Sequence, residues 1–146
     1  MPIRSEQTFH AAVDTLRSHG LRLTPQRLDL LRLLVEAPGS LSAYDIYPLL
    51  RRKHPNVSMD TVYRNLFMLT TSGLVGQINL QNREAARFEF QGKGHHHHAV
   101  CLSCGTALCI DGCPSELDAL FCDTPGFRTV NHVFELYGYC SDCEQP

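Results

Sequence analysis

The chain has no tryptophan, no long apolar run and no cysteine before position 101. A helix that crosses a bilayer needs about 20 consecutive apolar residues, and no stretch of this sequence approaches that length. The N-terminal residues include Glu6 and Asp14 and lack the apolar core of a secretion signal, so we expect a cytoplasmic protein. In a cytoplasmic protein, seven cysteines are more typical of metal binding than of disulfides.

Basic residues are almost absent from the last third of the chain. Residues 95–146 contain a single arginine, Arg128, and seven acidic residues, whereas residues 1–94 contain twelve basic and eight acidic residues. The formal charges are therefore −6 and +4, although the whole chain carries only −2. All the cysteines and five of the eight histidines lie in the acidic part. This division predicts two functional halves, one suited to phosphate groups and one to cations.

Apolar residues recur at helical spacing in four segments of the first half. Side chains that cap helix N-termini precede three of these segments, namely Thr24, Ser42 and Ser58. Ser42 with Asp45 three residues later also resembles a capping box, and Gly20 suits the end of the first segment. We therefore expect helices over about residues 5–19, 25–37, 43–53 and 59–71.

Two short strand patterns follow at residues 74–80 and 87–90, joined by a polar turn. Helices followed by a hairpin predict a winged helix, in which the last helix enters the major groove of DNA. That helix carries Thr61, Tyr63 and Arg64. Tyr63 can contact a thymine methyl group or a phosphate, and Arg64 can reach a phosphate or a guanine. The alternative is a helical bundle with a solvated basic face, because a basic face alone is a weak signal.

Two Cys-x-x-Cys pairs, Cys101/Cys104 and Cys140/Cys143, enclose 35 residues. Two such pairs can together bind one tetrahedral zinc ion. The ion would join the ends of a segment too small to have much apolar core, so metal binding would supply folding free energy. A redox dithiol is the alternative, but two matched pairs favour a structural metal.

Four consecutive histidines, at positions 95–98, precede the first cysteine pair. A purification tag is the ordinary explanation of such a run, but tags are usually longer and terminal. On a strand, alternate side chains point to opposite faces, so this run can serve two different ions. Other potential metal donors nearby are Glu89, Cys109, Cys113, Glu116, Cys122 and His132. A lone cysteine is more often a small buried residue than a ligand.

These motifs, taken in order, resemble the ferric uptake regulator family. The motifs are Thr24-Pro25-Gln26-Arg27, the run from Asp60 to Leu66, the histidines leading into Cys101-Leu-Ser-Cys104-Gly105, and His132-x-Phe-Glu-Leu-Tyr-Gly-x-Cys140. The resemblance covers about residues 21–143 and implies an α+β fold. It implies a winged-helix DNA-binding domain over residues 1–92 and a metal-binding α/β dimerisation domain over residues 93–146. It also implies a dimeric, non-enzymatic repressor of palindromic operator DNA.

The resemblance assigns residues of this chain to four sites. The structural zinc site matches Cys101, Cys104, Cys140 and Cys143. The sensing site near the hinge matches Glu89, His96 and His98, and Cys109 replaces an acidic ligand there. A second metal site matches His95, His97, Glu116 and His132. The implied DNA contacts are Arg22, Arg27, Thr61, Tyr63 and Arg64.

The chain departs from the family pattern at three positions. Iron and peroxide sensors usually have a histidine where this chain has Ser40, and zinc sensors usually have a cysteine where it has Phe90. Cys109 supplies a thiolate in place of a carboxylate, and thiolate with imidazole favours zinc over manganese or iron(II). The turn at residues 112–114 is also similar to that of the zinc uptake regulator branch.

We therefore expect Zn²⁺ in both the structural and the regulatory site, and repression of metal-uptake genes in response to zinc. Which of Cys109, Cys113 and Glu89 completes the sensing site is left open by the sequence. An iron(II)-, manganese- or peroxide-responsive member of the same family is the alternative. A zinc metalloenzyme and a thiol redox switch are the alternatives from other classes.

Overall fold

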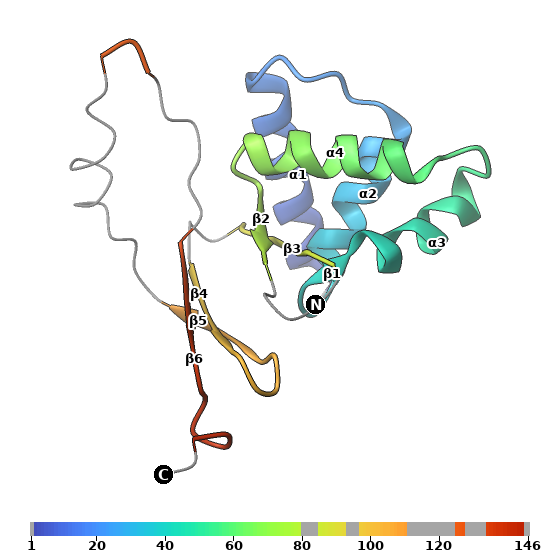
Figure 1. The fold of residues 1–146 in the computed structure, drawn as a ribbon. Coiled ribbons are helices and arrows are strands. Elements are labelled where there is room, and N and C mark those ends of the chain that lie inside the picture. Colours follow the sequence, from blue (N-terminus) through green and yellow to red (C-terminus); the bar gives the residue numbers. More distant parts are fainter. Residues whose placement is uncertain (1, 80–84, 93–96, 111–124, 128–133, 145–146) are drawn as a thin grey trace.

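The computed structural model describes residues 2–79, 85–92, 97–110, 125–127 and 134–144. Its N-terminal part consists of helices and a small sheet, as Figure 1 shows. The helices are α1 (Pro2–Ser18), α2 (Pro25–Glu36), α3 (Ala43–Lys53) and α4 (Met59–Thr71). The strands are β1 (Leu41–Ser42), β2 (Val75–Ile78) and β3 (Arg87–Phe90). All four predicted helices and both predicted strands are confirmed, although α1 begins earlier than expected.

The helices begin where side chains satisfy their free N–H groups. The Thr24 hydroxyl accepts the N–H of Arg27 at 3.2 Å, and the Ser58 hydroxyl accepts the N–H of Thr61 at 3.1 Å. At α3 the capping box is complete, because the Ser42 hydroxyl accepts from the Asp45 N–H at 3.1 Å and the Asp45 carboxylate accepts from the Ser42 N–H at 2.9 Å. The three predicted N-caps are thus confirmed.

The sheet of the N-terminal part has the strand order β1-β3-β2 and is antiparallel throughout. Strand β1 was not predicted, because two residues are too few to show a period. It pairs Leu41 with Phe88 and Ser42 with Arg87. The Arg87 guanidinium also donates to the Ser40 hydroxyl at 2.9 Å. The chain between α2 and α3 is therefore fixed to the wing strand that leads to the second half.

The apolar core lies between the four helices and the sheet. The large side chains that are fully buried come from every helix and from β2: Leu16, Leu30, Leu31, Leu34, Ile46, Leu50, Val62, Leu66, Leu69 and Val75. Helix α4 buries Val62, Leu66 and Leu69, which is the face expected from its sequence. Tyr63 and Arg64 are exposed and lie outside this buried face of α4.

The C-terminal part contains a second sheet with the order β5-β4-β6. Strand β5 (Ala107–Ile110) pairs antiparallel with β4 (His97–Cys101), and β6 (Glu135–Gly138) pairs parallel with it. Figure 1 shows this sheet beside the N-terminal part, with the chain end beyond it. Helices and sheets in this arrangement confirm the α+β class. Within the described ranges, no helix is both long and apolar enough to cross a membrane.

Candidate metal centre and DNA-facing helix

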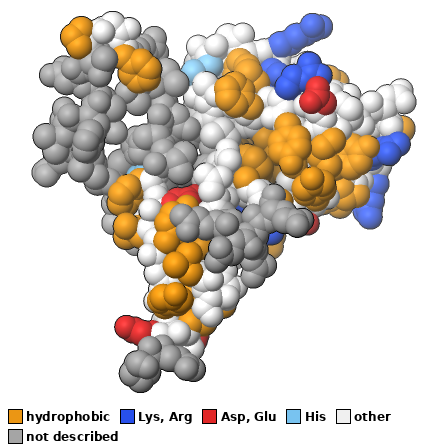
Figure 2. Space-filling view, in the orientation of Figure 1, with side chains coloured by type: hydrophobic (Ala, Val, Ile, Leu, Met, Phe, Trp, Pro, Cys, Tyr) orange, Lys and Arg blue, Asp and Glu red, His pale blue; other side chains and the backbone are white. Residues whose placement is uncertain are grey.

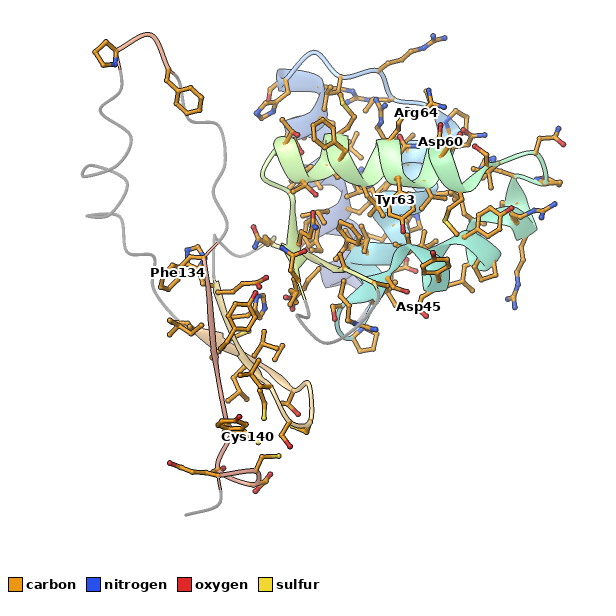
Figure 3. All side chains as sticks on the ribbon, in the orientation of Figure 1. Asp45, Asp60, Tyr63, Arg64, Phe134 and Cys140 are labelled. Carbon is orange, nitrogen blue, oxygen red and sulfur yellow. The ribbon has the colours of Figure 1, made fainter. Side chains whose placement is uncertain are left out.

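Four cysteines meet at the end of the C-terminal sheet. Their sulfur atoms all lie within 4.8 Å of one another, and the Sγ atoms of Cys104 and Cys140 are 3.8 Å apart. Two sulfurs bound to one tetrahedral zinc ion at about 2.3 Å lie about 3.8 Å from each other. Strands β4 and β6 are neighbours, so the Cys-x-x-Cys turns that follow them are brought together (Figure 3). This cluster has the spacing of a four-thiolate metal site.

Hydrogen bonds and neighbouring thiols shift the pKa values of Cys101, Cys104 and Cys143. The backbone N–H groups of Cys104 and Cys140 lower the pKa of Cys101 to about 6, and the second of them lies 3.4 Å from the sulfur. The Thr106 hydroxyl lowers the pKa of Cys104. At Cys143 the Ser103 hydroxyl lowers the pKa, but the neighbouring thiols outweigh it and raise the value to about 12. Four thiols this close can all ionise together only beside a compensating cation.

A carboxylate–imidazole pair joins the two sheets. Glu89 on β3 and His98 on β4 lie 2.9 Å apart, measured between Oε2 and Nε2, and His98 is buried. This separation is a hydrogen-bond distance, and nitrogen and oxygen ligands about 2.1 Å from one tetrahedral zinc ion would be about 3.4 Å apart. A movement of about 0.5 Å would therefore let both groups bind a single zinc ion. The pair also links the wing hairpin to the C-terminal sheet.

Cys109 is the cross-strand partner of His98 in the β4–β5 pair. Residues directly opposite each other in antiparallel strands project from the same face. The backbone thus aligns the thiol with the imidazole of His98. Among the described residues, however, the four cysteines are the only group of three or more possible metal ligands whose ligand atoms all lie within 4.8 Å of one another. The fourth predicted sensing residue, His96, lies outside the described residues.

One residue of the predicted second metal site, His97, lies among the described residues. His97 is buried on β4, and its ring packs edge-on against that of Phe134, with the centroids 5.5 Å apart. His97 and His98 are consecutive on a strand, so their side chains point to opposite faces, as the sequence predicted. The other three residues of the predicted site, His95, Glu116 and His132, lie outside the described residues.

Helix α4 presents two of the predicted DNA contacts to solvent. Tyr63 and Arg64 are exposed, and the Arg64 guanidinium lies 3.8 Å from the Asp60 carboxylate one turn earlier (Figure 3). Thr61 is half-buried near the helix start, and Arg22 is exposed in the loop before α2. These four positions remain available to a partner.

Arg27, the fifth predicted DNA contact, is engaged inside the protein. Its guanidinium donates to the Asn65 side-chain oxygen at 3.0 Å and to the backbone oxygen of Arg22. Asn65 is buried and donates in turn to the Thr61 carbonyl oxygen at 3.0 Å. Arg27 and Asn65 thus connect α2 with α4. Sequence reasoning missed Asn65, although a polar residue at a buried position of a helix is a usable signal.

A second contact between the two parts was also missed. The Glu135 carboxylate on β6 accepts the backbone N–H of Asn79, just after β2, at 2.7 Å. The Tyr137 hydroxyl donates to Glu135 and lies 3.3 Å from the Asn79 carbonyl oxygen. The hydrogen bond to Glu135 raises the pKa of Tyr137 to about 12, so its hydroxyl remains a donor at neutral pH. Two side chains of β6 thus hold the end of β2, in the wing, against the C-terminal sheet.

Known proteins are similar to this chain in sequence. Residues 18–137 match the Ferric uptake regulator family. The chain is 37% identical over 136 residues to the peroxide operon regulator of Bacillus subtilis, and the matched region covers 92% of each protein. It is 30% identical over 140 residues to the peroxide-responsive repressor PerR of Staphylococcus saprophyticus, covering 95% of this chain and 93% of that protein.

Solved structures show the same architecture. A zinc uptake regulator complexed with zinc and DNA superposes with a TM-score of 0.67 and 28% identity, covering 94% of this chain and 93% of the other. The ferric uptake regulator of Helicobacter pylori superposes with a TM-score of 0.64 and 22% identity, covering 97% and 95% of the two chains. At that identity the second likeness supports the fold alone.

Proposed function

Because the chain belongs to the ferric uptake regulator family, we propose that it is a zinc-responsive repressor acting as a homodimer in the cytoplasm. Its targets are palindromic operators of metal-uptake genes. Family membership makes the chain a metal-responsive transcription regulator and not an enzyme, so the metalloenzyme alternative is wrong. The sensed metal and the roles of individual residues are the part that we propose.

The observation behind this proposal is the junction of Glu89, His98 and Cys109. The first two lie 2.9 Å apart across the two sheets, and the third is opposite His98 in the β4–β5 pair. A donor set of imidazole, carboxylate and thiolate suits a borderline-soft ion, and the thiolate disfavours manganese and iron(II). His96 completes the proposed set. In this assignment Cys109 determines the choice of metal.

The four-cysteine cluster would hold a second, structural zinc ion. Its sulfur spacing fits a tetrahedral thiolate site, and zinc bound by four thiolates keeps no open position for a substrate. The ion would join the turn after β4 to the turn after β6. Its contribution is folding free energy, which a segment with few buried apolar residues needs. We propose His95, His97, Glu116 and His132 as a separate metal site of lesser regulatory weight.

Regulation would follow from joining the wing to the C-terminal sheet. Metal held by Glu89 on β3, by His98 on β4 and by His96 would restrict the angle between the two parts. In a dimer this angle sets the distance between the two copies of α4, and a palindromic operator accepts one such distance. Metal and operator DNA must therefore each increase the affinity for the other by the same factor.

An exposed apolar face of the C-terminal sheet supports the homodimer. Leu108, Ala99 and Leu136 are register partners across β5, β4 and β6, so they lie in a row on one face. Leu108 and Leu136 are each about half exposed. Apolar side chains in a row on a sheet are commonly covered by another surface. A second copy of this chain would supply one.

A peroxide-responsive repressor is the second candidate function. The curated relatives described above are peroxide regulators, and the B. subtilis protein is 37% identical to this chain. Such a function would place iron(II) or manganese in the sensing site. Ser40 and Cys109 are the positions where this chain departs from the ligands expected for it.

A DNA-binding titration tests the two candidates. The full chain is purified under reducing conditions, and duplexes that it binds are selected from a random library in the presence of zinc or of iron(II). Binding to these duplexes is then measured against buffered zinc, iron(II), manganese and nickel. We expect zinc to act at the lowest free concentration, and Cys109→Ser to weaken the zinc response specifically. Binding driven by iron(II) or manganese and abolished by peroxide would contradict the zinc assignment.

A further inference from the structure

Three aromatic side chains stand exposed on the helices that would face DNA. Tyr63 and Phe67 lie one turn apart on α4, and Tyr44 lies in the first turn of α3. Their exposed fractions are 43% for Tyr63, 69% for Phe67 and 63% for Tyr44. We call these three residues the aromatic patch. Figure 2 shows apolar side chains gathered over this part of the molecule, with Lys and Arg side chains at the margins.

The hydroxyl groups of Tyr44 and Tyr63 interact. Burial raises the pKa of Tyr63, and the neighbouring Tyr44 hydroxyl adds to this rise. The side chains of Tyr44 on α3 and Tyr63 on α4 are therefore close together.

The aromatic patch does not contribute to the protein core. Helix α4 fills the core with Val62, Leu66 and Leu69 on its opposite face. An exposed phenylalanine in the middle of a helix leaves a large apolar area in water, which is most often retained where a partner covers it. The folding of the N-terminal part therefore gives no reason for Phe67 at this position.

Basic residues outnumber acidic ones on α3 and α4, where the acidic residues are Asp45 and Asp60. Arg64 is exposed next to Tyr63 on α4, and Arg51, Arg52 and Lys53 are exposed in the last turn of α3. An apolar centre with a cationic border matches a DNA major groove, in which the thymine methyl is the apolar group and the phosphates line the edges. The patch is continuous with the proposed contacts of Tyr63 and Arg64. This arrangement favours DNA over a protein partner.

We propose that Tyr44 and Phe67 are specificity-determining residues that extend the contact of Tyr63 with thymine methyl groups in the operator. Phe67 follows Tyr63 by four residues, or about 6 Å along the helix axis. The rise of DNA is about 3.4 Å per base pair, so the two rings would meet thymines about two steps apart. Tyr44, which is 63% exposed, would add a third ring to this surface. This inference rests on the proposed function, since it requires α4 in the groove.

The test removes thymine methyls without changing base pairing. The zinc-loaded full chain is used to select duplexes from a random library, and the selected half-site is remade with deoxyuridine in place of each thymine. We expect the wild type to lose about fourfold in affinity for each contacted methyl. Deoxyuridine outside the half-sites, in the same duplex, should have no effect.

Protein variants connect that loss to individual side chains. Phe67→Ala should bind the thymine duplex more weakly and should no longer distinguish thymine from deoxyuridine at one position. That position should lie about two base pairs from the thymine contacted by the Tyr63 ring. Tyr63→Phe keeps the ring and should still distinguish the two bases there. Tyr44→Phe and Tyr63→Phe should be non-additive, because each removes the same hydroxyl contact. Phe127→Ala is the matched control, since Phe127 is 67% exposed but lies far along the chain from α4. Dimer mass and melting temperature are checked for every variant.

The outcomes separate this inference from the function on which it rests. Metal-dependent binding that is equally tight for thymine and deoxyuridine duplexes would overturn the inference alone. Equal losses of Phe67→Ala on both duplexes would overturn it as well, because the ring would then act through general packing. A chain that binds no duplex with any of the metals would contradict the proposed function itself.

Discussion

The described residues of the N-terminal and C-terminal parts of this chain differ in how many apolar side chains they bury. The N-terminal part buries apolar side chains from four helices and a sheet around one core. In the described residues of the C-terminal part, the buried apolar side chains are Val100 and Cys101, and the second belongs to the cysteine cluster. Packing can stabilise the first part, and we propose that bound metal stabilises the second. In this proposal folding and metal sensing belong to separate regions, which are in contact through Glu89 and His98.

The largest expected effect follows from removing a cysteine of the four-cysteine cluster. Cys101→Ser should abolish zinc binding there and unfold the C-terminal part, because structural zinc contributes on the order of 10 kcal/mol. The dimer should dissociate while α1 to α4 remain folded. Zinc content, native mass and helix content by circular dichroism measure the three effects. Cys109→Ser is the control, since it removes a thiol outside the cluster and should leave the cluster's zinc, the dimer and the helices unchanged. A zinc-free variant that stayed a stable dimer would refute the structural role.

A cavity in the helical core should destabilise the N-terminal part and leave the C-terminal part unchanged. Leu66 is almost completely buried on α4, and Leu66→Ala should lower the free energy of unfolding by about 2–5 kcal/mol. The loss should affect the unfolding of the helices and leave the zinc bound by the four cysteines unchanged. Urea unfolding monitored by circular dichroism, together with zinc analysis, measures both. A parallel loss of zinc would indicate that the two parts fold as one unit.

The junction between the parts is tested by Glu89→Gln and His98→Ala. Loss of a metal ligand should weaken the metal response of DNA binding by about tenfold or more, and the four-cysteine zinc and the dimer should remain. Glu135→Gln is the comparison variant. It alters the other contact between the parts, the 2.7 Å hydrogen bond to Asn79, without removing a proposed ligand. Equal metal responses of the wild type and His98→Ala would contradict the sensing assignment.

Sequence patterns predicted the features that depend on local residues. The caps at Thr24, Ser42 and Ser58 were recognised because each satisfies N–H groups two or three residues away. The cysteine pairs were recognised because their Cys-x-x-Cys spacing is typical of metal sites. Each of these features can be read from a short window of the chain.

Contacts between distant segments could not be predicted in the same way. The pairing of β1 with β3, the hydrogen bond from Asn79 to Glu135 and the contact of Tyr44 with Tyr63 depend on how elements pack. Arg27 illustrates the difference. The sequence shows a basic residue at this position but does not show that the Arg27 guanidinium donates to Asn65, 38 positions away. The predicted DNA contact of Arg27 stays a prediction.

The smallest expected effect concerns the capping box of α3. The Ser42 N–H and hydroxyl hold the pKa of Asp45 below its usual value, with a smaller contribution from Arg87. A carboxyl with a lowered pKa stabilises the folded state above its ordinary pKa, and this stabilisation is lost as the pH falls through the lowered value. Asp45→Ala should cost about 0.5–1 kcal/mol at pH 7, and the difference from the wild type should shrink below about pH 4. Asp45→Asn, which keeps an acceptor for the Ser42 N–H, should cost less than Asp45→Ala at pH 7. Urea unfolding of the helices at pH 3 to 7 measures this trend, and a difference independent of pH would show that the charge of Asp45 adds nothing to the cap.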